Sequence, residues 1–169
     1  GETPVTAFGD ATTLSFHATK LFTTAEGGAV VGSDTALKTR IDSLRNFGTV
    51  QDFDVVDLGL NGKMSELHAA LGLTNLPLVE EERRLRQEIC TAYVEELRGI
   101  EGIRCPPLST DEMGALQYFP LRIDMRSRDR IYDGLKSFNV FARKYFQPLC
   151  SQTHFYRELP SSAPANLPV

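Results

Sequence analysis

The sequence ATTLSFHATKLFTTAEGGAVVG, residues 11–32, decides how the first part of the chain folds. Its two ends, residues 11–16 and 28–32, are short apolar or β-branched runs bounded by Gly, Asp and Thr, which is a composition typical of β-strands. The residues between them form a polar loop that carries His17, Thr19 and Lys20. A lysine in such a loop is most often a solvated surface residue, so its role depends on the sequence around it.

A helix and a long loop are predicted after the second strand. Ser33 can cap a helix over residues 34–47, where apolar residues recur at helical spacing, and Gly48 would end it. Residues 49–63 are rich in Asp and Gly and show little periodicity, which predicts a loop. Long loops in compact domains are more often functional than idle.

Two further helices and a smaller α+β region complete the expected order. Ser65 begins a helix over residues 66–73, and an amphipathic helix over residues 77–97 is long enough to join two domains. The pattern then predicts strand, strand, helix and strand, at residues 103–105, 118–123, 128–137 and 140–143. This order suggests a small α+β domain.

Composition narrows the class of protein. The chain has 169 residues, of which 41% are hydrophobic and 24% charged, enough for an ordinary globular core. It lacks an apolar run long enough for a membrane helix and begins without a signal-peptide pattern, so we expect a cytoplasmic protein with no membrane partner. Cys90, Cys105 and Cys150 are too scattered for a disulfide framework or a metal site. Scattered basic residues and a net charge of −4 argue against nucleic acid as a partner.

Several phrases, in matching order along nearly the whole chain, carry a resemblance to a known family. They are FGD (8–10), SFHATK (15–20), EGGAVV (26–31), LRNFG (44–48), LNGKMSELHAA (60–70), RKYFQPL (143–149) and YRELP (156–160). The chain resembles the DegT/DnrJ-type nucleotide-sugar aminotransferases, which are fold-type I enzymes that use pyridoxal 5'-phosphate. The resemblance implies an α/β fold: the C-terminal part of the large domain, followed by a small α+β domain.

The resemblance gives Lys20 and Ser15 roles in cofactor binding. Lys20 matches the lysine that forms the internal aldimine, and an unprotonated amine is the group that such an attack on a carbonyl requires. Once freed, the same amine would move the proton between substrate and cofactor carbons. Ser15 matches a serine that hydrogen-bonds the cofactor phosphate. The alternative is a strand serine bonded to nearby backbone.

Asn61 and Lys63 lie in the family's Gly-x-Asn-x-Arg-Met phrase. Asn61 matches the asparagine that reaches the phosphate in the neighbouring subunit of a homodimer, although a turn asparagine is the simpler explanation. Lys63 replaces the family's arginine and lacks its bidentate fork. It could still face a substrate phosphate, or it could be a solvated lysine.

Three other residues, His17, Tyr145 and Phe146, also match positions of the family. His17 matches a family histidine, which we interpret as support for the loop and not as a catalyst. Tyr145 and Phe146 match an aromatic-proline phrase near the active-site mouth, where they would contact substrate; they could equally pack the small domain. This phrase is closer to that of enzymes that aminate carbon 4 of a dTDP-4-keto-6-deoxy sugar than to that of enzymes acting at carbon 3.

The resemblance also predicts how the chain is divided and what it does. Residues 1–76 would belong to the large cofactor-binding domain, 77–99 would form an interdomain helix, and 100–169 would belong to the small domain. Both ends look truncated: the aspartate that pairs with the pyridine nitrogen is expected before residue 1, and residues 167–169 resemble the point where the family continues into a further helix and strand. The expected reaction transfers an amino group from glutamate to a nucleotide-linked keto sugar. A noncatalytic regulatory relative and a sugar dehydratase are the alternatives; related dehydratases carry histidine where Lys20 stands.

Overall fold

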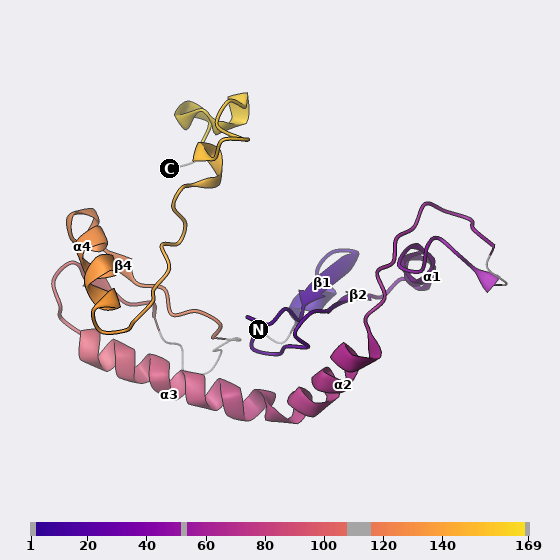
Figure 1. The fold of residues 1–169 in the computed structure, drawn as a ribbon, viewed down its shortest axis with the longest axis horizontal. Coiled ribbons are helices and arrows are strands. Elements are labelled where there is room, and N and C mark those ends of the chain that lie inside the picture. Colours follow the sequence, from indigo (N-terminus) through magenta and orange to yellow (C-terminus); the bar gives the residue numbers. More distant parts are fainter. Residues whose placement is uncertain (1–2, 52–53, 108–115, 168–169) are drawn as a thin grey trace. The chain divides into compact units, whose positions relative to one another are not determined.

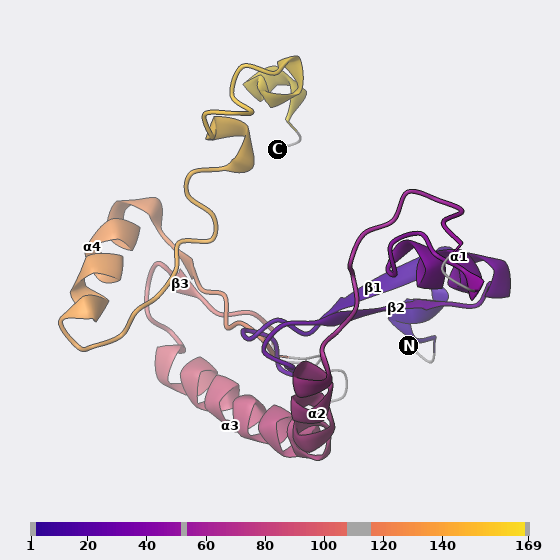
Figure 2. The same cartoon turned by 45° about the vertical axis from the view of Figure 1, so that its right-hand side comes forward.

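The computed structural model describes residues 3–51, 54–107 and 116–167. The chain divides into two compact units, and the elements of each are traced in Figures 1 and 2. The first unit combines Gly1–Arg98 with Pro106–Pro120, and the second combines Gly99–Cys105 with Leu121–Val169. Helices and strands are mixed in both units. No helix in the described ranges has the length and apolar character needed to cross a membrane.

The first unit opens with a two-stranded antiparallel sheet. Strand β1 (Ala11–Ser15) pairs with β2 (Gly28–Gly32) in a register that sets Ala11 opposite Gly32 and Ser15 opposite Gly28. Figure 2 shows the two strands lying side by side. Both predicted strands are confirmed, and β1 ends one residue earlier than expected. The polar loop between them begins directly after Ser15.

Helix α1 (Thr35–Leu44) is shorter than predicted. Its N-cap is Asp34, not Ser33, because the Asp34 carboxylate accepts the Ala36 N–H. The helix does not reach Phe47, whose N–H donates to the Leu60 carbonyl at 3.0 Å and whose φ is +62°. The apolar side chain of Phe47 fits the helical spacing, but its backbone is used in the following loop.

The predicted loop after α1 is confirmed in its described part and contains only two isolated bridges, Asn46 to Asn61 and Thr49 to Val55. Two of its glycines are needed because the backbone approaches itself closely. A Cβ at Gly48 would lie 1.8 Å from the Asp57 carbonyl oxygen, and one at Gly59 would lie 1.9 Å from the Gly48 nitrogen. The loop therefore has a definite fold of its own.

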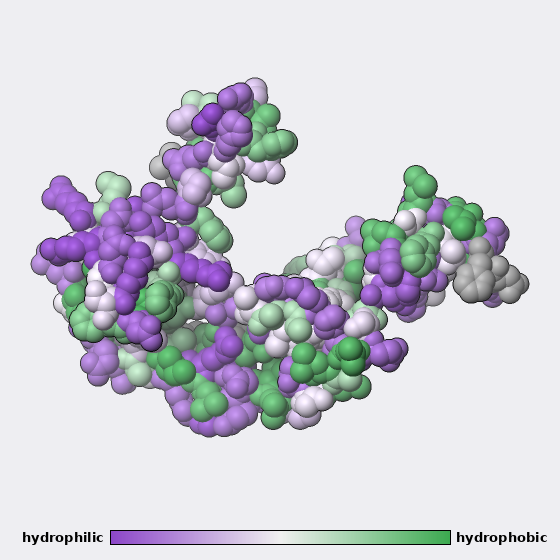
Figure 3. Space-filling model, in the orientation of Figure 1, coloured by the Kyte–Doolittle hydropathy of each residue, from purple (hydrophilic) through white to green (hydrophobic). Residues whose placement is uncertain are grey.

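Two helices follow in the first unit. Ser65 caps α2 (Glu66–Asn75), as predicted, by accepting the His68 N–H, and hydrophobic side chains gather on the surface over this helix (Figure 3). A 3-10 turn, Leu76–Leu78, leads into α3 (Val79–Leu97), which begins two residues later than expected. The ring of Phe119 stacks on that of Tyr93 of α3, with 5.1 Å between centroids.

The described part of the second unit has an antiparallel pair of two-residue strands, one α-helix and three short 3-10 turns, Cys150–Gln152, Pro160–Ser162 and Pro164–Asn166. Strand β3 (Ile103–Arg104) pairs with β4 (Arg122–Ile123), and α4 (Met125–Lys136) follows, capped by Asp124. The helix begins three residues before its predicted start. The predicted strand over residues 140–143 is wrong: the Val140 N–H donates to the Leu135 carbonyl at the end of α4, and no ladder forms.

Candidate active site

The lysine loop, residues 16–27, is closed at its base by backbone hydrogen bonds. The Phe16 N–H donates to the Gly27 carbonyl at 2.9 Å, and the Thr24 N–H donates to the Phe16 carbonyl at 2.9 Å. The Phe16 ring also meets the Phe22 ring edge to face, with centroids 4.9 Å apart. Residues 17–23 are therefore held at both ends.

Two threonine side chains stabilise the last part of this loop, residues 23–26, where the chain returns toward β2. The Thr23 hydroxyl donates to the Phe16 carbonyl at 3.2 Å and accepts the Ala25 N–H at 3.0 Å. The Thr24 hydroxyl donates to the Glu26 carbonyl at 2.7 Å, and this side chain is only 1% exposed. Side chains thus supply partners that a strand ladder would otherwise provide.

Helix α2 packs against the lysine loop and forms a hydrogen bond with it. The Asn75 side-chain amide donates to the Thr23 carbonyl at 3.0 Å, across 52 residues of sequence. A Cβ at Gly72 would lie 2.8 Å from Thr24 Cγ2, so the absence of a side chain there lets the loop pack against the helix. The loop is consequently a defined part of the first unit.

Lys20 is presented by a tight turn within the loop. Its N–H donates to the His17 carbonyl at 2.9 Å, and its side chain is partly exposed. Ser15 is the last residue of β1, five positions earlier, and is exposed. Within residues 3–51, 54–107 and 116–167, no hydrogen bond or ion pair engages the Lys20 amine or the Ser15 hydroxyl. Both groups are available to a ligand.

Asn61 lies on a segment that pairs with the end of α1. The Leu60 N–H donates to the Leu44 carbonyl and the Gly62 N–H donates to the Arg45 carbonyl, each at 2.8 Å. The Asn61 side chain between them is exposed and forms no hydrogen bond with another described residue.

The same segment reaches the base of the lysine loop. A Cβ at Gly27 would lie 3.3 Å from the Sδ atom of Met64, three residues after Asn61, so the Met64 side chain packs against this end of the loop. The structure thus brings the segment that carries Asn61 next to the loop that carries Lys20.

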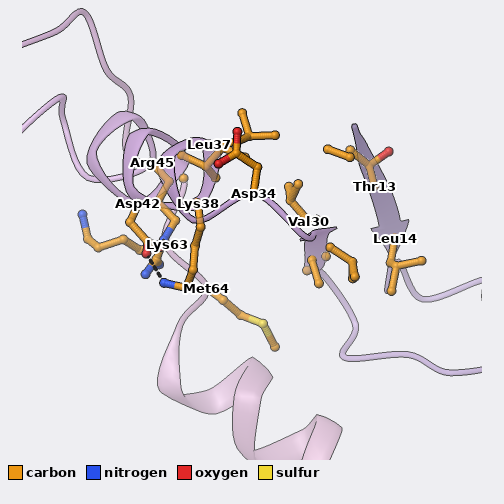
Figure 4. Close-up of a pocket in the computed structure, with 18 residues that line it drawn as sticks. Thr13, Leu14, Val30, Asp34, Leu37, Lys38, Asp42, Arg45, Lys63 and Met64 are labelled. Atoms are coloured by element: carbon orange, nitrogen blue, oxygen red, sulfur yellow. Dashed lines mark hydrogen bonds and ion pairs between the residues drawn. The ribbon is translucent and has the colours of Figure 1, made fainter. Parts of the chain in front are cut away.

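The Lys63 side chain contacts Phe47 and lies beside a groove that Lys20 does not line. Its Nζ lies 4.1 Å from the centroid of the Phe47 ring, a cation–π contact. It also borders an open groove of about 870 Å³ formed by β1, β2 and α1, shown in Figure 4. Ser15, Lys20 and Asn61 do not line this groove. The groove is therefore not where the sequence predicts the cofactor.

The predicted substrate residues Tyr145 and Phe146 belong to the second unit, where their ring centroids lie 4.1 Å apart and both side chains are exposed. The neighbouring Lys144 donates to the Asp129 carboxylate at 2.8 Å and lies over the Tyr132 ring at 4.7 Å. Hydrogen bonds from Arg128 and Lys144 lower the pKa of Asp129 to about 2. This ion pair ties the start of the aromatic phrase to α4.

The side chains of Ser15, Lys20 and Asn61 fit the groups of pyridoxal phosphate. A primary amine can attack an aldehyde, and a hydroxyl and a carboxamide can both donate to a phosphate. All three lack competing partners among the described residues. The sequence alone did not identify the residues that hold the loop around Lys20, which are Thr19, Thr23, Thr24 and Asn75. Thr19 lies inside the SFHATK segment but has no signal of its own, and Asn75 is distant in sequence.

Comparison with known proteins shows the class to which this fold and this lysine loop belong. The DegT/DnrJ/EryC1/StrS aminotransferase family matches residues 1–169. The chain is 42% identical over 147 residues to a dTDP-4-amino-4,6-dideoxy-D-glucose transaminase of Escherichia coli, covering 85% of this chain and 40% of that protein. A protein of the same name from Shigella dysenteriae is 39% identical over 151 residues, covering 88% and 41%.

Solved structures of aminotransferases are also similar to this chain. The chain is similar to DesI, crystallised in the presence of its TDP-sugar product, with a TM-score of 0.83 and 37% identity over 93% of this chain and 41% of that one. It is also similar to Helicobacter pylori PseC, an aminotransferase involved in the biosynthesis of pseudoaminic acid, with a TM-score of 0.86 and 28% identity over 96% and 46%. The chain belongs to the DegT/DnrJ/EryC1/StrS aminotransferase family. It spans about two fifths of the length of these curated relatives.

Proposed function

We propose that this protein is a pyridoxal-phosphate-dependent aminotransferase that transfers an amino group from glutamate to a nucleotide-linked keto sugar. The observation that carries the proposal is the lysine loop. It presents Lys20 on a hydrogen-bonded turn, with an amine that no other described residue engages. Membership of an aminotransferase family gives that lysine its chemical meaning.

The bound cofactor would supply an electron sink for the substrate carbon. Lys20 Nζ would anchor that cofactor and, once free, would move the proton between the substrate carbon and the cofactor carbon. The Ser15 hydroxyl, at the end of β1, would donate to the cofactor phosphate. The hydrogen bonds of Thr23, Thr24 and Asn75 keep the lysine loop in place while these groups act.

For the substrate, we propose carbon 4 of a dTDP-4-keto-6-deoxyhexose. Two relatives are named as dTDP-4-amino-4,6-dideoxy-D-glucose transaminases, and DesI was crystallised with a TDP-sugar product. Tyr145 and Phe146 would contact the sugar nucleotide through their exposed rings. Lys63 would contribute a point charge toward a phosphate, in competition with its contact to Phe47.

We further propose a cytoplasmic homodimer in which Asn61 donates to the cofactor phosphate of the neighbouring subunit. The exposed, unpaired carboxamide on the folded loop after α1 supports this role. The proposed division assigns residues 1–76 to the cofactor-binding domain, 77–99 to an interdomain helix and 100–169 to the small domain. The two compact units of the structure divide between Arg98 and Gly99, and residues 106–120 belong to the first unit.

The test is turnover by the full-length protein of a panel of dTDP- and UDP-linked keto sugars with glutamate, with products identified by mass spectrometry. We expect an amino sugar from dTDP-4-keto-6-deoxyglucose, and a loss of more than about 10²–10⁴-fold in Lys20→Ala, the range of a general base alone. Lys38→Ala, at an exposed lysine of α1, is the matched control and should retain activity. Deoxygenated products would indicate a dehydratase, and no turnover of any substrate would indicate a noncatalytic relative.

A further inference from the structure

The imidazole of His17 lies between two groups of the lysine loop. Its Nδ1 atom is 3.2 Å from the Thr19 backbone nitrogen and 3.0 Å from the Thr19 hydroxyl oxygen. Its Nε2 atom is 3.7 Å from a carboxylate oxygen of Glu26, and these two side chains are 48% and 70% exposed. The sequence predicts only that His17 supports the loop, and the comparisons give these contacts no role.

These contacts determine which ring nitrogen carries the proton. A backbone N–H can only donate, so Nδ1 must accept from Thr19 and must itself be unprotonated. The Thr19 hydroxyl can donate to the same atom as a second, shared hydrogen bond. The proton of the neutral ring then resides on Nε2, on the side where the Glu26 carboxylate lies. Since Glu26 is beyond hydrogen-bond distance and well exposed, its attraction is weak, and the Thr19 N–H decides the tautomer.

His17 therefore contacts the lysine turn twice. Its carbonyl accepts the Lys20 N–H at 2.9 Å, and its imidazole accepts the N–H of the preceding residue, Thr19. A side chain that accepts the N–H two residues later mimics one more turn of backbone, in the way that Asn and Asp do in Asx-turns. The backbone on which the Lys20 side chain starts is thereby fixed.

We infer that His17 is a positioning residue for Lys20: its Nδ1 atom, in the Nε2–H tautomer, accepts the Thr19 N–H and holds the turn from which the lysine reaches the cofactor. This inference rests on the proposed function of Lys20 for its meaning, but the hydrogen bond itself does not. A histidine that only fills space at this position would not depend on which of its nitrogens accepts.

Two substitutions separate these possibilities. Asparagine places its side-chain oxygen at the same branch position as Nδ1, so His17→Asn keeps an acceptor for the Thr19 N–H. Glutamine places its terminal atoms one bond further out, near the position of Nε2, so His17→Gln loses this acceptor while remaining polar and of similar size. The pair forms a matched test of Nδ1 alone, and Glu26→Gln tests the other side of the ring.

The first measurement is amide hydrogen exchange at Thr19 in the cofactor-free protein. Loss of one hydrogen bond predicts exchange about fivefold faster in His17→Gln, with His17→Asn close to the original protein and Glu26→Gln little changed. The ¹⁵N shifts of the His17 ring should identify the Nε2–H tautomer. Equal exchange in the Asn and Gln variants, or an Nδ1–H tautomer, would overturn the inference.

The second measurement is the rate at which pyridoxal phosphate becomes attached to Lys20, followed by borohydride reduction at timed intervals and peptide mass spectrometry. His17→Gln should slow attachment several-fold and His17→Asn should restore it. Equal rates in all variants would contradict the positioning role. If the full-length protein takes up no cofactor at Lys20, the proposed function fails, and the exchange and tautomer data still decide the role of His17 in the turn.

Discussion

The lysine loop and the aromatic segment, residues 140–149, each carry residues with a proposed ligand role and are built in opposite ways. In the lysine loop, Thr24 is 1% exposed and side chains satisfy the backbone of the loop return. In the aromatic segment, Phe141 is 77% exposed and Phe146 is 65% exposed. The ion pair of Lys144 with Asp129 is the one salt bridge that anchors the described part of that segment.

The difference follows from what each region is proposed to hold. A covalent anchor must be placed before its ligand arrives, because a small displacement of the reacting amine is costly. Rings that contact a sugar nucleotide can stay exposed until the ligand covers them, since aromatic faces contribute mainly by burial on binding. Stability should therefore respond strongly to substitutions in the lysine loop and weakly to those in the aromatic segment.

The largest expected effect comes from Thr24→Val. The substitution keeps the shape of the side chain but leaves the Glu26 carbonyl without the Thr24 hydroxyl inside a buried contact. We expect a loss of about 1–3 kcal/mol in the free energy of unfolding of the first unit, measured by urea denaturation. Thr13→Val, at an exposed position of β1, is the control and should stay within about 0.5 kcal/mol of the original. Equal losses in the two variants would show that the hydrogen bond of the Thr24 hydroxyl does not stabilise the lysine loop.

A smaller effect is expected from Asp129→Asn, and it should depend on pH. Arg128 and Lys144 lower the pKa of the folded Asp129 to about 2, below its ordinary value, so the carboxylate stabilises the second unit above about pH 4 and this contribution is lost as the pH falls toward 2. The thermal midpoint of the variant should lie below the original at pH 7 and converge with it near pH 2.

Asp133→Asn is the control for Asp129→Asn, because it removes a carboxylate from the same helix, paired with Lys136, without touching Lys144. Its effect should be smaller. A gap between Asp129→Asn and the original protein that widens as the pH falls would contradict the assignment of this ion pair.

The smallest change in stability is expected from Phe146→Ala. Because the ring is exposed, the free energy of unfolding should change by no more than about 0.5 kcal/mol. The KM for the sugar nucleotide should nevertheless rise, since the ring is proposed to contact it. Phe138→Ala, at another exposed phenylalanine of the second unit, should leave both quantities unchanged. A large loss of stability in Phe146→Ala would show that the ring packs the small domain instead.

Local sequence signals predicted the elements whose stability is local. The strands on either side of the lysine loop and the Ser65 cap of α2 were found because their alternation and capping chemistry lie within a few residues. Helix α1 was predicted too long because Phe47 fits the apolar spacing while its N–H bonds to Leu60. The start of α4 was missed because the turn after Asp124 is polar and lacks an apolar repeat.

Contacts across long sequence separations could not be predicted. Asn75 reaches Thr23 over 52 residues, and only the packing of α2 on the loop reveals it. The strand expected over residues 140–143 had a suitable composition, but a strand needs a partner edge and the segment has none among the described residues. The roles of Ser15, Lys20 and Asn61 came from a family resemblance. The structure adds the backbone hydrogen bonds that hold the turn of Lys20 and the segment of Asn61.

The central claim is that Lys20 alone among the lysines carries the cofactor. The most direct measurement is borohydride reduction of the full-length protein incubated with pyridoxal phosphate, followed by peptide mass spectrometry of every lysine. We expect one reduced adduct per chain, on Lys20, absent from Lys20→Ala and unchanged in Lys38→Ala. An adduct on Lys38 or Lys63, or an equal yield from Lys20→Ala, would contradict it.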